Sequence, residues 1–231
     1  MAVMAKAPRV GQVKTRLAAT LSPEAAAGLS ACFIRDAIGN IAAAATEAAI
    51  DGYVAYSPRD AEGEFREMLI DGIRLLPSRR AGLAASLYDA AANLLTAGYG
   101  SVCLINSDSP TLPTAVLVDA ARLLSGSGDR IVLGPAEDGG YYLIGLTRPH
   151  ARLFEEITWS TSAVFAQTVE RAREIGLDPE VLPGWYDVDD LESLRRLDGE
   201  LLGEATNGSG HQGIYRAPHT AAFLRARRAE K

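Results

Sequence analysis

Short apolar segments alternate with longer segments of helical spacing along the first half of this chain, and this alternation restricts the folds open to it. Apolar runs of this length are typical of buried strands, whereas apolar residues three to four positions apart indicate amphipathic helices. Strands connected through helices run parallel and need cover on both faces, so we expect an α/β domain with a mostly parallel sheet. The predicted strands are residues 3–5, 53–56, 73–76, 102–105, 131–133 and 142–145, and the predicted helices include residues 22–47, 62–70, 84–97 and 113–124.

The domain organisation is predicted to be simple. The length of 231 residues suits one α/β unit, and neither an internal repeat nor a long linker divides it. We therefore predict a single domain over residues 1–231. The polar, glycine-rich residues 204–212 are expected to form a flexible loop, and residues 218–231 a C-terminal helix.

Charge and composition exclude several classes of protein. A net charge of −6 argues against a broad nucleic-acid-binding surface. The chain has no apolar stretch long enough for a bilayer and no signal-peptide core at its N-terminus. Cys32 and Cys103 lie in apolar patterns typical of buried thiols in a reducing compartment. We expect a cytoplasmic protein without nucleic-acid or membrane partners, and the sequence leaves a monomer and a homodimer open.

The most informative segment is the apolar run 102–105, which ends abruptly in Asn106, Ser107 and Asp108. The pattern is typical of a buried strand whose carboxyl end reaches the surface. Ligands bind at that edge of open α/β sheets. A carboxylate there is well placed to hold a divalent cation and, through it, a phosphate. The alternative is that Asp108 only caps the helix that follows Pro110.

The loop 6–16 follows the first predicted strand and has the composition of a phosphate-binding loop. It contains glycine, threonine, arginines and two of the three lysines of the chain. The GxxxxGK[ST] spacing of a P-loop is absent. The alternative interpretation is a solvated basic turn.

A second acidic segment carries Asp187, Asp189 and Asp190 within four residues. Such carboxylates repel one another unless a cation or a helix N-terminus offsets their charge. Either Asp189 or Asp190 is a natural helix cap, but capping accounts for one carboxylate and not for three. A metal ligand from this segment would complete a site that Asp108 begins.

Two further segments carry both a structural and a ligand-binding interpretation. Residues 137–141 contain an Asp-Gly pair that is typical of a β-hairpin turn. Their glycines would also let a ligand approach the backbone closely. In residues 159–161, Trp159 belongs either to the core or to a pocket wall, and Ser160 or Thr161 is a natural helix cap. The three histidines lack ligand spacing and are interpreted as surface residues.

Taken in order, these motifs resemble a known family. They are Lys6-Ala-Pro-x-x-Gly-x-Val-Lys-Thr-Arg-Leu17, Ser107-Asp-Ser-Pro110, Gly134-Pro-Ala-x-Asp-Gly-Gly-Tyr-Tyr-Leu143, Trp159-Ser-Thr161 and Asp187-Val-Asp189. The chain resembles bacterial GT-A-fold glycosyltransferases of the arsenosugar-biosynthesis type over about residues 3–197. That family is related to nucleotidylyltransferases of the molybdenum-cofactor and phospholactate guanylyltransferase kind. The resemblance implies a three-layer, Rossmann-like nucleotide-diphosphosugar transferase fold with a mostly parallel mixed sheet.

The resemblance also implies an activity and a set of roles. The expected activity is that of a metal-dependent glycosyltransferase with a nucleotide-diphosphate sugar donor and a small acceptor. Mg²⁺ or Mn²⁺ would be held by Asp108 and by Asp187 or Asp189, and the expected catalytic residues are Asp108, Lys14 and Arg16. The expected nucleotide-binding residues are Lys6, Pro8, Gly11, Lys14, Thr15, Arg16 and Ser107. The expected acceptor-binding residues are Asp138, Gly139, Gly140, Tyr141, Trp159, Ser160 and Thr161.

Two other functions stay open. A nucleotidylyltransferase could use the same site, for example by transferring a guanylyl group to a small phosphorylated acceptor and releasing pyrophosphate. The segment 14–17 resembles the phospholactate guanylyltransferase loop. A non-catalytic nucleotide-binding protein is the other alternative, because residues 80–86 lack the acid and the arginine that family members often carry there. Asn106 also replaces a frequent glycine.

Overall fold

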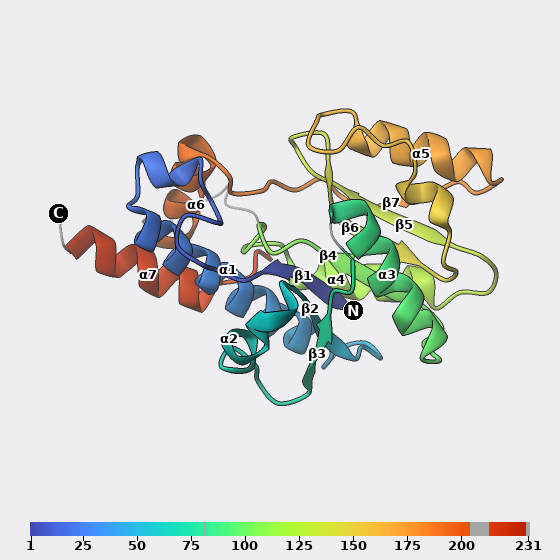
Figure 1. Ribbon diagram of the computed structural model, residues 1–231, viewed down its shortest axis with the longest axis horizontal. Coiled ribbons are helices and arrows are strands. Elements are labelled where there is room, and N and C mark those ends of the chain that lie inside the picture. Colours follow the sequence, from blue (N-terminus) through green and yellow to red (C-terminus); the bar gives the residue numbers. More distant parts are fainter. Residues whose placement is uncertain (81, 204–212, 230–231) are drawn as a thin grey trace.

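The computed structural model describes residues 1–80, 82–203 and 213–229, which fold around one mixed sheet (Figure 1). Its strands are β1 (Ala2–Lys6), β2 (Gly52–Ser57), β3 (Ile73–Pro77), β4 (Val102–Ile105), β5 (Ile131–Pro135), β6 (Tyr141–Leu146) and β7 (Glu180–Val181). Their order across the sheet is β3-β2-β1-β4-β6-β5-β7. β6 runs antiparallel to its neighbours β4 and β5, and the other neighbouring pairs are parallel. The predicted α/β class with a mostly parallel mixed sheet is confirmed.

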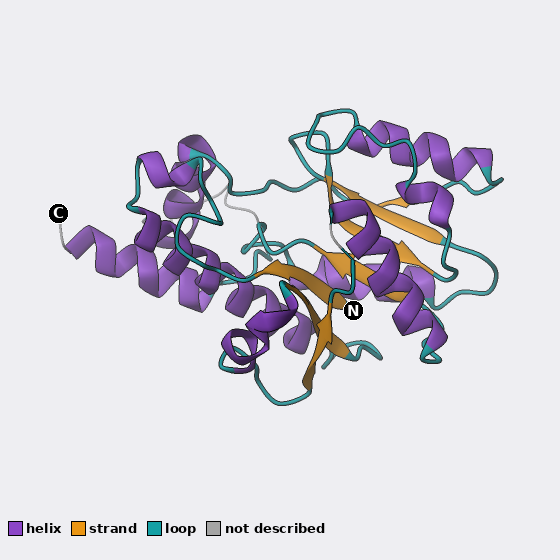
Figure 2. Ribbon diagram, in the orientation of Figure 1, coloured by secondary structure: helices purple, strands orange, loops and turns teal. Residues whose placement is uncertain are grey.

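Helices cover both faces of this sheet, as expected for parallel strands that are apolar on both sides (Figure 2). One face is covered by α1 (Pro23–Ala44), α2 (Glu62–Arg66), α4 (Thr114–Leu124), α6 (Leu191–Leu202) and α7 (Pro218–Ala229). The other face is covered by α3 (Leu83–Thr96), the 3₁₀ helix η3 (Ala151–Phe154) and α5 (Val164–Glu174). Two further 3₁₀ turns are η1 (Leu17–Ala19) and η2 (Arg59–Ala61). Figure 1 shows α1, α6 and α7 gathered on one side, away from α3 and α5.

The central strand β4 shows why the sheet needs both layers. Cys103 and Ile105 belong to the apolar core that includes α1, whereas Val102 and Leu104 belong to the core that includes α3. All four side chains are buried. A continuous apolar run is therefore required here, because successive residues of a strand point to opposite faces.

Helix ends follow the local sequence closely where a cap is present. The Ser22 side chain accepts a hydrogen bond from Ala25 N, and proline occupies the first position of α1, as predicted. The predicted helix 62–70 is shorter and ends at Arg66, because the chain then turns towards β3 through Gly72 at a φ of 84°. The predicted C-terminal helix is α7, which is described as far as Ala229.

Two predicted segments near the C-terminus lie wholly or partly outside the residues that the structure describes. The predicted flexible loop 204–212 and the last two residues of the predicted helix 218–231 lie outside the described residues. The single domain over residues 1–231 stays a prediction. None of the helices in the described parts of the chain has the length and apolar character needed to cross a bilayer.

Candidate functional site

The motif-bearing loops meet at the carboxyl edge of the parallel strands. The loops after β1 and β4 both leave the sheet there, because these strands are parallel neighbours. The β5–β6 hairpin turns at the same edge, since β6 is antiparallel to β4 and pairs Leu143, near its start, with Ile105. This is the edge at which open α/β sheets bind ligands.

The segment 183–189 closes this edge by running from the hairpin to the β4 loop. Glu137 N donates a hydrogen bond to Trp185 O at 2.9 Å, and Val188 N donates to Asp108 O at 2.8 Å. These backbone bonds hold the second acidic segment beside the first. The predicted convergence of Asp108 with residues 187–189 is therefore present in the structure.

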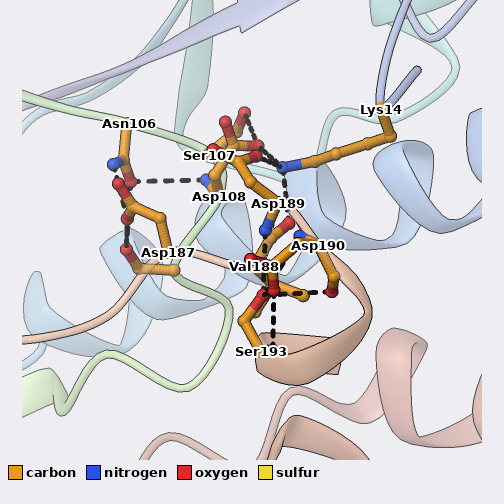
Figure 3. A network of polar contacts seen from close by, with 10 residues as sticks. Lys14, Asn106, Ser107, Asp108, Asp187, Val188, Asp189, Asp190 and Ser193 are labelled. Carbon is orange, nitrogen blue, oxygen red and sulfur yellow. Dashed lines mark hydrogen bonds and ion pairs between the residues drawn. The ribbon is translucent and has the colours of Figure 1, made fainter. Parts of the chain in front are cut away.

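Lys14 joins the two acidic segments (Figure 3). Its Nζ lies 2.7 Å from Asp108 Oδ1 and 2.8 Å from Asp189 Oδ1, and it donates a hydrogen bond to Val188 O at 2.9 Å. The ring centroid of Phe33 lies 5.3 Å from Nζ, within the range of a cation–π contact. The Lys14 side chain is only 5% exposed. The ammonium is thus buried among oxygen acceptors that come from two other loops.

The electrostatics of Lys14 keep it charged in this position. Burial on its own lowers the pKa of Lys14, but the charges of Asp108 and Asp189 outweigh burial and raise the pKa above its ordinary value. The Lys14 backbone has a φ of 47°, in the left-handed region that L-residues rarely adopt. Such backbone strain persists only where the surroundings hold it in place, and it is common at functional sites.

Asp187 has different partners from Asp108 and Asp189. Asn106 Nδ2 donates to Asp187 Oδ1 at 2.8 Å, and Ser109 Oγ donates to the same oxygen. Burial, and after it the nearby charge of Asp108, raise the pKa of Asp187 to about 6, although the hydrogen bonds from Ser109 and Asn106 lower it. Asn106 Oδ1 also accepts a hydrogen bond from Asp108 N at 3.3 Å. The Asn106 amide therefore ties the two acidic segments together, a role that sequence reasoning missed.

Helix capping accounts for only one of the acidic residues. Asp190 is the N-cap of α6, where its side chain accepts a hydrogen bond from Ser193 N at 2.9 Å. The N-cap of α4 is Pro113, which makes no side-chain cap bond, so Asp108 does not cap that helix. The capping alternative is thus excluded for Asp108 and confirmed for Asp190.

The donor set at this edge suits a divalent cation held by two carboxylates. No group of three or more His, Cys, Asp or Glu side chains in the described residues is arranged to hold a metal ion. The carboxylates of Asp108 and Asp189 nevertheless both contact the Lys14 ammonium, and their side chains are 35% and 44% exposed. Mg²⁺ commonly uses one or two carboxylates, with water and substrate phosphates completing its shell. Asp108 and Asp189 fit that arrangement, whereas Asp187 is engaged by Asn106 and Ser109.

The other predicted nucleotide-binding residues lie in the same loop as Lys14, except for Ser107, which follows β4 and donates a hydrogen bond to Asp108 Oδ1 at 3.4 Å. Lys6 Nζ donates to Gln12 O at 2.9 Å, within its own loop. The exposed members of the set are Gly11, Thr15 and Arg16, and the partly exposed members are Pro8 and Ser107. Their role at a nucleotide stays a prediction.

The predicted acceptor residues begin with the turn of the β5–β6 hairpin. The Asp138 side chain accepts a hydrogen bond from Gly140 N at 2.8 Å, which accounts for the carboxylate within the turn. Gly139 has a φ of 88°, and a Cβ there would lie 2.3 Å from Ser162 O. Only glycine fits this position, because both the backbone conformation and the close approach exclude a side chain.

The remaining acceptor residues lie against that turn. Phe165 N donates to Gly139 O at 2.9 Å, which fixes the start of α5 on the hairpin. The rings of Tyr141 and Trp159 meet edge to face, with centroids 6.4 Å apart. Ser160 has a φ of 63°, and Thr161 Oγ1 donates to Thr158 O at 2.7 Å. The structure thus brings the two predicted acceptor segments together, while acceptor binding itself stays a prediction.

Solved structures share this fold. The crystal structure of a candidate nucleotide-diphospho-sugar transferase from Desulfovibrio desulfuricans G20 has a TM-score of 0.80 and 29% identity, covering 99% of this chain and 94% of that chain. A nucleotidyl transferase from Methanothermobacter thermautotroptrophicus has a TM-score of 0.51 and 16% identity, covering 85% of this chain and 94% of that chain. The inositol-1-phosphate CTP transferase from T. maritima has a TM-score of 0.50 and 14% identity, covering 83% and 90%. The predicted nucleotide-diphosphosugar transferase fold is confirmed.

Sequence comparison gives the family. No curated protein matches this chain in sequence. Residues 40–161 match the profile of a family described as uncharacterized protein conserved in bacteria, DUF2064. The match covers more than half of the chain, which therefore belongs to this bacterial family of uncharacterized proteins, DUF2064.

Proposed function

We propose that this chain is a metal-dependent glycosyltransferase that uses a nucleotide-diphosphate sugar as donor. The observation that carries the proposal is the meeting of Lys14, Asp108 and Asp189 at the carboxyl edge of the sheet. Two carboxylates and a buried ammonium at that edge suit a ligand that combines a divalent cation with phosphates. The similarity to the D. desulfuricans protein, described as a candidate nucleotide-diphospho-sugar transferase, supports the choice of donor.

In this proposal Asp108 and Asp189 hold Mg²⁺ or Mn²⁺. Bound there, the ion would neutralise the diphosphate of the donor. Lys14 and Arg16, from the loop after β1, would stabilise the negative charge that develops on the nucleoside diphosphate as its bond to the sugar breaks. Asn106 would keep the two acidic segments in register through its bonds to Asp187 and Asp108.

The acceptor would enter beside the β5–β6 hairpin. The hairpin residues 138–141 and Trp159 lie at the carboxyl edge of the sheet. The segment 183–189 links this hairpin to Asp108 through backbone hydrogen bonds. The hairpin turn is held against the start of α5, because Phe165 N donates to Gly139 O and Gly139 leaves no room for a side chain beside Ser162. A fixed acceptor position matters because transfer requires the two reacting groups to be held in line.

Product analysis tests the proposal. The purified protein is incubated with UDP-sugars, GTP and CTP together with a mixture of small hydroxyl-bearing and phosphorylated acceptors, with and without Mn²⁺, and calorimetry measures binding of the same nucleotides. Mn²⁺-dependent release of a nucleoside diphosphate is expected. Release of pyrophosphate would instead indicate nucleotidyl transfer, and binding without any product would indicate a non-catalytic nucleotide-binding protein.

A pair of variants shows whether the assigned carboxylates are responsible. Asp189→Asn should abolish the Mn²⁺-dependent reaction, because an amide is a poor substitute for a carboxylate ligand of a hard cation. Asp190→Asn is the matched control, since it removes the same charge from the adjacent residue while asparagine still caps α6. Equal activity of the two variants would contradict the role of Asp189.

A further inference from the structure

The ammonium of Lys14 lies where the two candidate metal-binding carboxylates meet. Its acceptors are Asp108 Oδ1 at 2.7 Å, Asp189 Oδ1 at 2.8 Å and Val188 O at 2.9 Å. Two carboxylate oxygens and a backbone carbonyl are also the ligand types that Mg²⁺ and Mn²⁺ prefer. An Mg²⁺ ion bound by these oxygens would lie about 2.0–2.1 Å from each of them. The ion and the ammonium cannot occupy this place together.

The burial and backbone conformation of Lys14 hold its side chain between the two carboxylates. Its side chain is 5% exposed and lies over the Phe33 ring. Its backbone adopts the uncommon φ of 47°. The carboxylates of Asp108 and Asp189 are far more exposed, so a ligand can reach them from solvent while Lys14 is in place.

We propose that Lys14 is a tethered cation that competes with the divalent ion for Asp108 and Asp189, and that substrate phosphates relieve this competition by drawing the ammonium away. The inference rests on the proposed function, since it concerns the regulation of the same site. Without substrate, Lys14 offsets the repulsion between the two carboxylates. A diphosphate offers the ammonium another set of anionic oxygens, and the carboxylates then become available to the ion.

The consequence is that ion and diphosphate depend on each other for binding. By linkage, the factor by which the diphosphate strengthens ion binding equals the factor by which the ion strengthens diphosphate binding. The substrate-free protein should therefore hold Mn²⁺ weakly. Removal of the Lys14 ammonium should strengthen Mn²⁺ binding and reduce its dependence on the diphosphate.

Mn²⁺ titration without nucleotide tests this inference, with free Mn²⁺ read by electron paramagnetic resonance. Lys14→Met removes the charge but keeps a long side chain against Phe33. We expect this variant to bind Mn²⁺ about ten- to a hundredfold more tightly than wild type, because one unit charge is lost beside the ion. After correction for Mn²⁺ held by free pyrophosphate, added pyrophosphate should strengthen Mn²⁺ binding by wild type more than by Lys14→Met.

Arg9→Met is the matched control. It removes the same charge from the same loop, but Arg9 pairs with Asp60 and Glu64, which lie outside the site. Its Mn²⁺ affinity should stay within about twofold of wild type, because solvent and salt screen a charge that does not touch the site. A gain as large as that of Lys14→Met would mean that general charge, and not competition for the carboxylates, governs Mn²⁺ binding.

Thermal unfolding gives a second reading that does not depend on activity. Lys14→Met leaves two carboxylates without their cation, so it should unfold at a lower temperature than wild type, and Mn²⁺ should restore much of the loss. If this variant does not fold, Lys14→Gln replaces it, since its amide still donates hydrogen bonds. Equal Mn²⁺ affinities of wild type and variant would overturn the inference alone. Absence of Mn²⁺ binding by both, with and without pyrophosphate, would overturn it together with the metal-dependent function.

Discussion

Two clusters of ion pairs in this molecule are built in opposite ways. At the junction of η3 and α5, two arginines face four glutamates at N–O distances of 2.6–3.7 Å. The members of this exposed cluster are Arg152, Glu155, Glu156, Glu170, Arg171 and Glu174. No two of them are more than 22 residues apart in sequence, and every one of the glutamates is more than a third exposed, whereas the Arg152 and Arg171 side chains are 28% and 12% exposed.

The cluster at the carboxyl edge has one cation, and its partners are distant in sequence. Lys14 is 175 residues from Asp189 and is 5% exposed. No local helix geometry brings these residues together. They meet because β1 and β4 are neighbours in the sheet and because the segment 183–189 is bound to the β4 loop.

The difference indicates what each cluster is for. Ion pairs with solvent-exposed carboxylates cost little to form, and each stabilises a protein by about 0–1 kcal/mol. A buried charge is expensive to desolvate, and a well-packed apolar side chain would often be at least as stable in its place. An ammonium buried between two acidic loops at a ligand-binding edge is therefore better explained by ligand chemistry than by stability.

The largest contrast between the clusters is expected in nucleotide binding. Asp108→Ala removes one of the two carboxylates that fit a divalent ion, so UDP binding in Mn²⁺ should weaken by about a hundredfold or more. Arg171→Ala should leave UDP affinity unchanged while lowering the unfolding temperature. Calorimetry with and without Mn²⁺, together with thermal unfolding, measures both effects. Unchanged affinity of Asp108→Ala in Mn²⁺ would refute the role assigned to Asp108.

A smaller contrast should separate phosphates from nucleosides. Without a divalent ion, Lys14→Ala should weaken UDP binding by about ten- to a hundredfold, since the phosphates would then face two uncompensated carboxylates. Uridine has no phosphate, and its affinity should change little. Parallel titrations of UDP and uridine in the presence of a chelator give the comparison. Equal losses for the two compounds would mean that this loop does not contact phosphate.

The sheet and the position of its acidic edge could be predicted because their causes are local. The apolar run of β4 ends in polar residues, and strand alternation places that end where open sheets bind ligands. The Asp190 cap was foreseeable from its position before a leucine-patterned helix. The meeting of Asp108 with residues 187–189 followed from the expectation that both lie at one edge.

The partners of individual side chains could not be predicted, because they depend on strand order and on loop conformation. The expected partners of Lys14 were phosphates, and only the pairing of β1 with β4 brings it to Asp108 and Asp189. Asn106 was noticed only as a replacement for glycine. Its bond to Asp187 depends on the path of a segment 81 residues away. The sequence did contain a signal for Asn106, because it is a polar residue that directly follows a buried strand and lies two positions before the candidate metal ligand Asp108.

Asn106 allows a test of intermediate size. Asn106→Ala removes the amide that donates to Asp187 and accepts from Asp108 N. The free energy of unfolding should fall by about 1–3 kcal/mol, because a partly buried carboxylate loses a donor. Mn²⁺ and UDP binding should weaken much less than in Asp108→Ala. Urea unfolding and calorimetry measure the two quantities, and a binding loss equal to that of Asp108→Ala would mean that Asn106 contacts the ligand itself.

The smallest effect is expected in the exposed cluster, where it should depend on pH. A hydrogen bond from Arg152, and then its charge, lower the pKa of Glu156 below its ordinary value. A carboxyl whose pKa is lower in the folded state stabilises the fold above the pKa of the unfolded chain, and this contribution is lost as the pH falls through the lowered pKa. Arg152→Met should therefore unfold slightly below wild type at neutral pH, and the two unfolding temperatures should converge below about pH 4. A difference in unfolding temperature that persists at pH 3 would show that Arg152 stabilises the η3–α5 junction through packing of its aliphatic stem. The charges of this cluster would then contribute little to stability, and it would differ from the Lys14 cluster in how deeply its cations are buried.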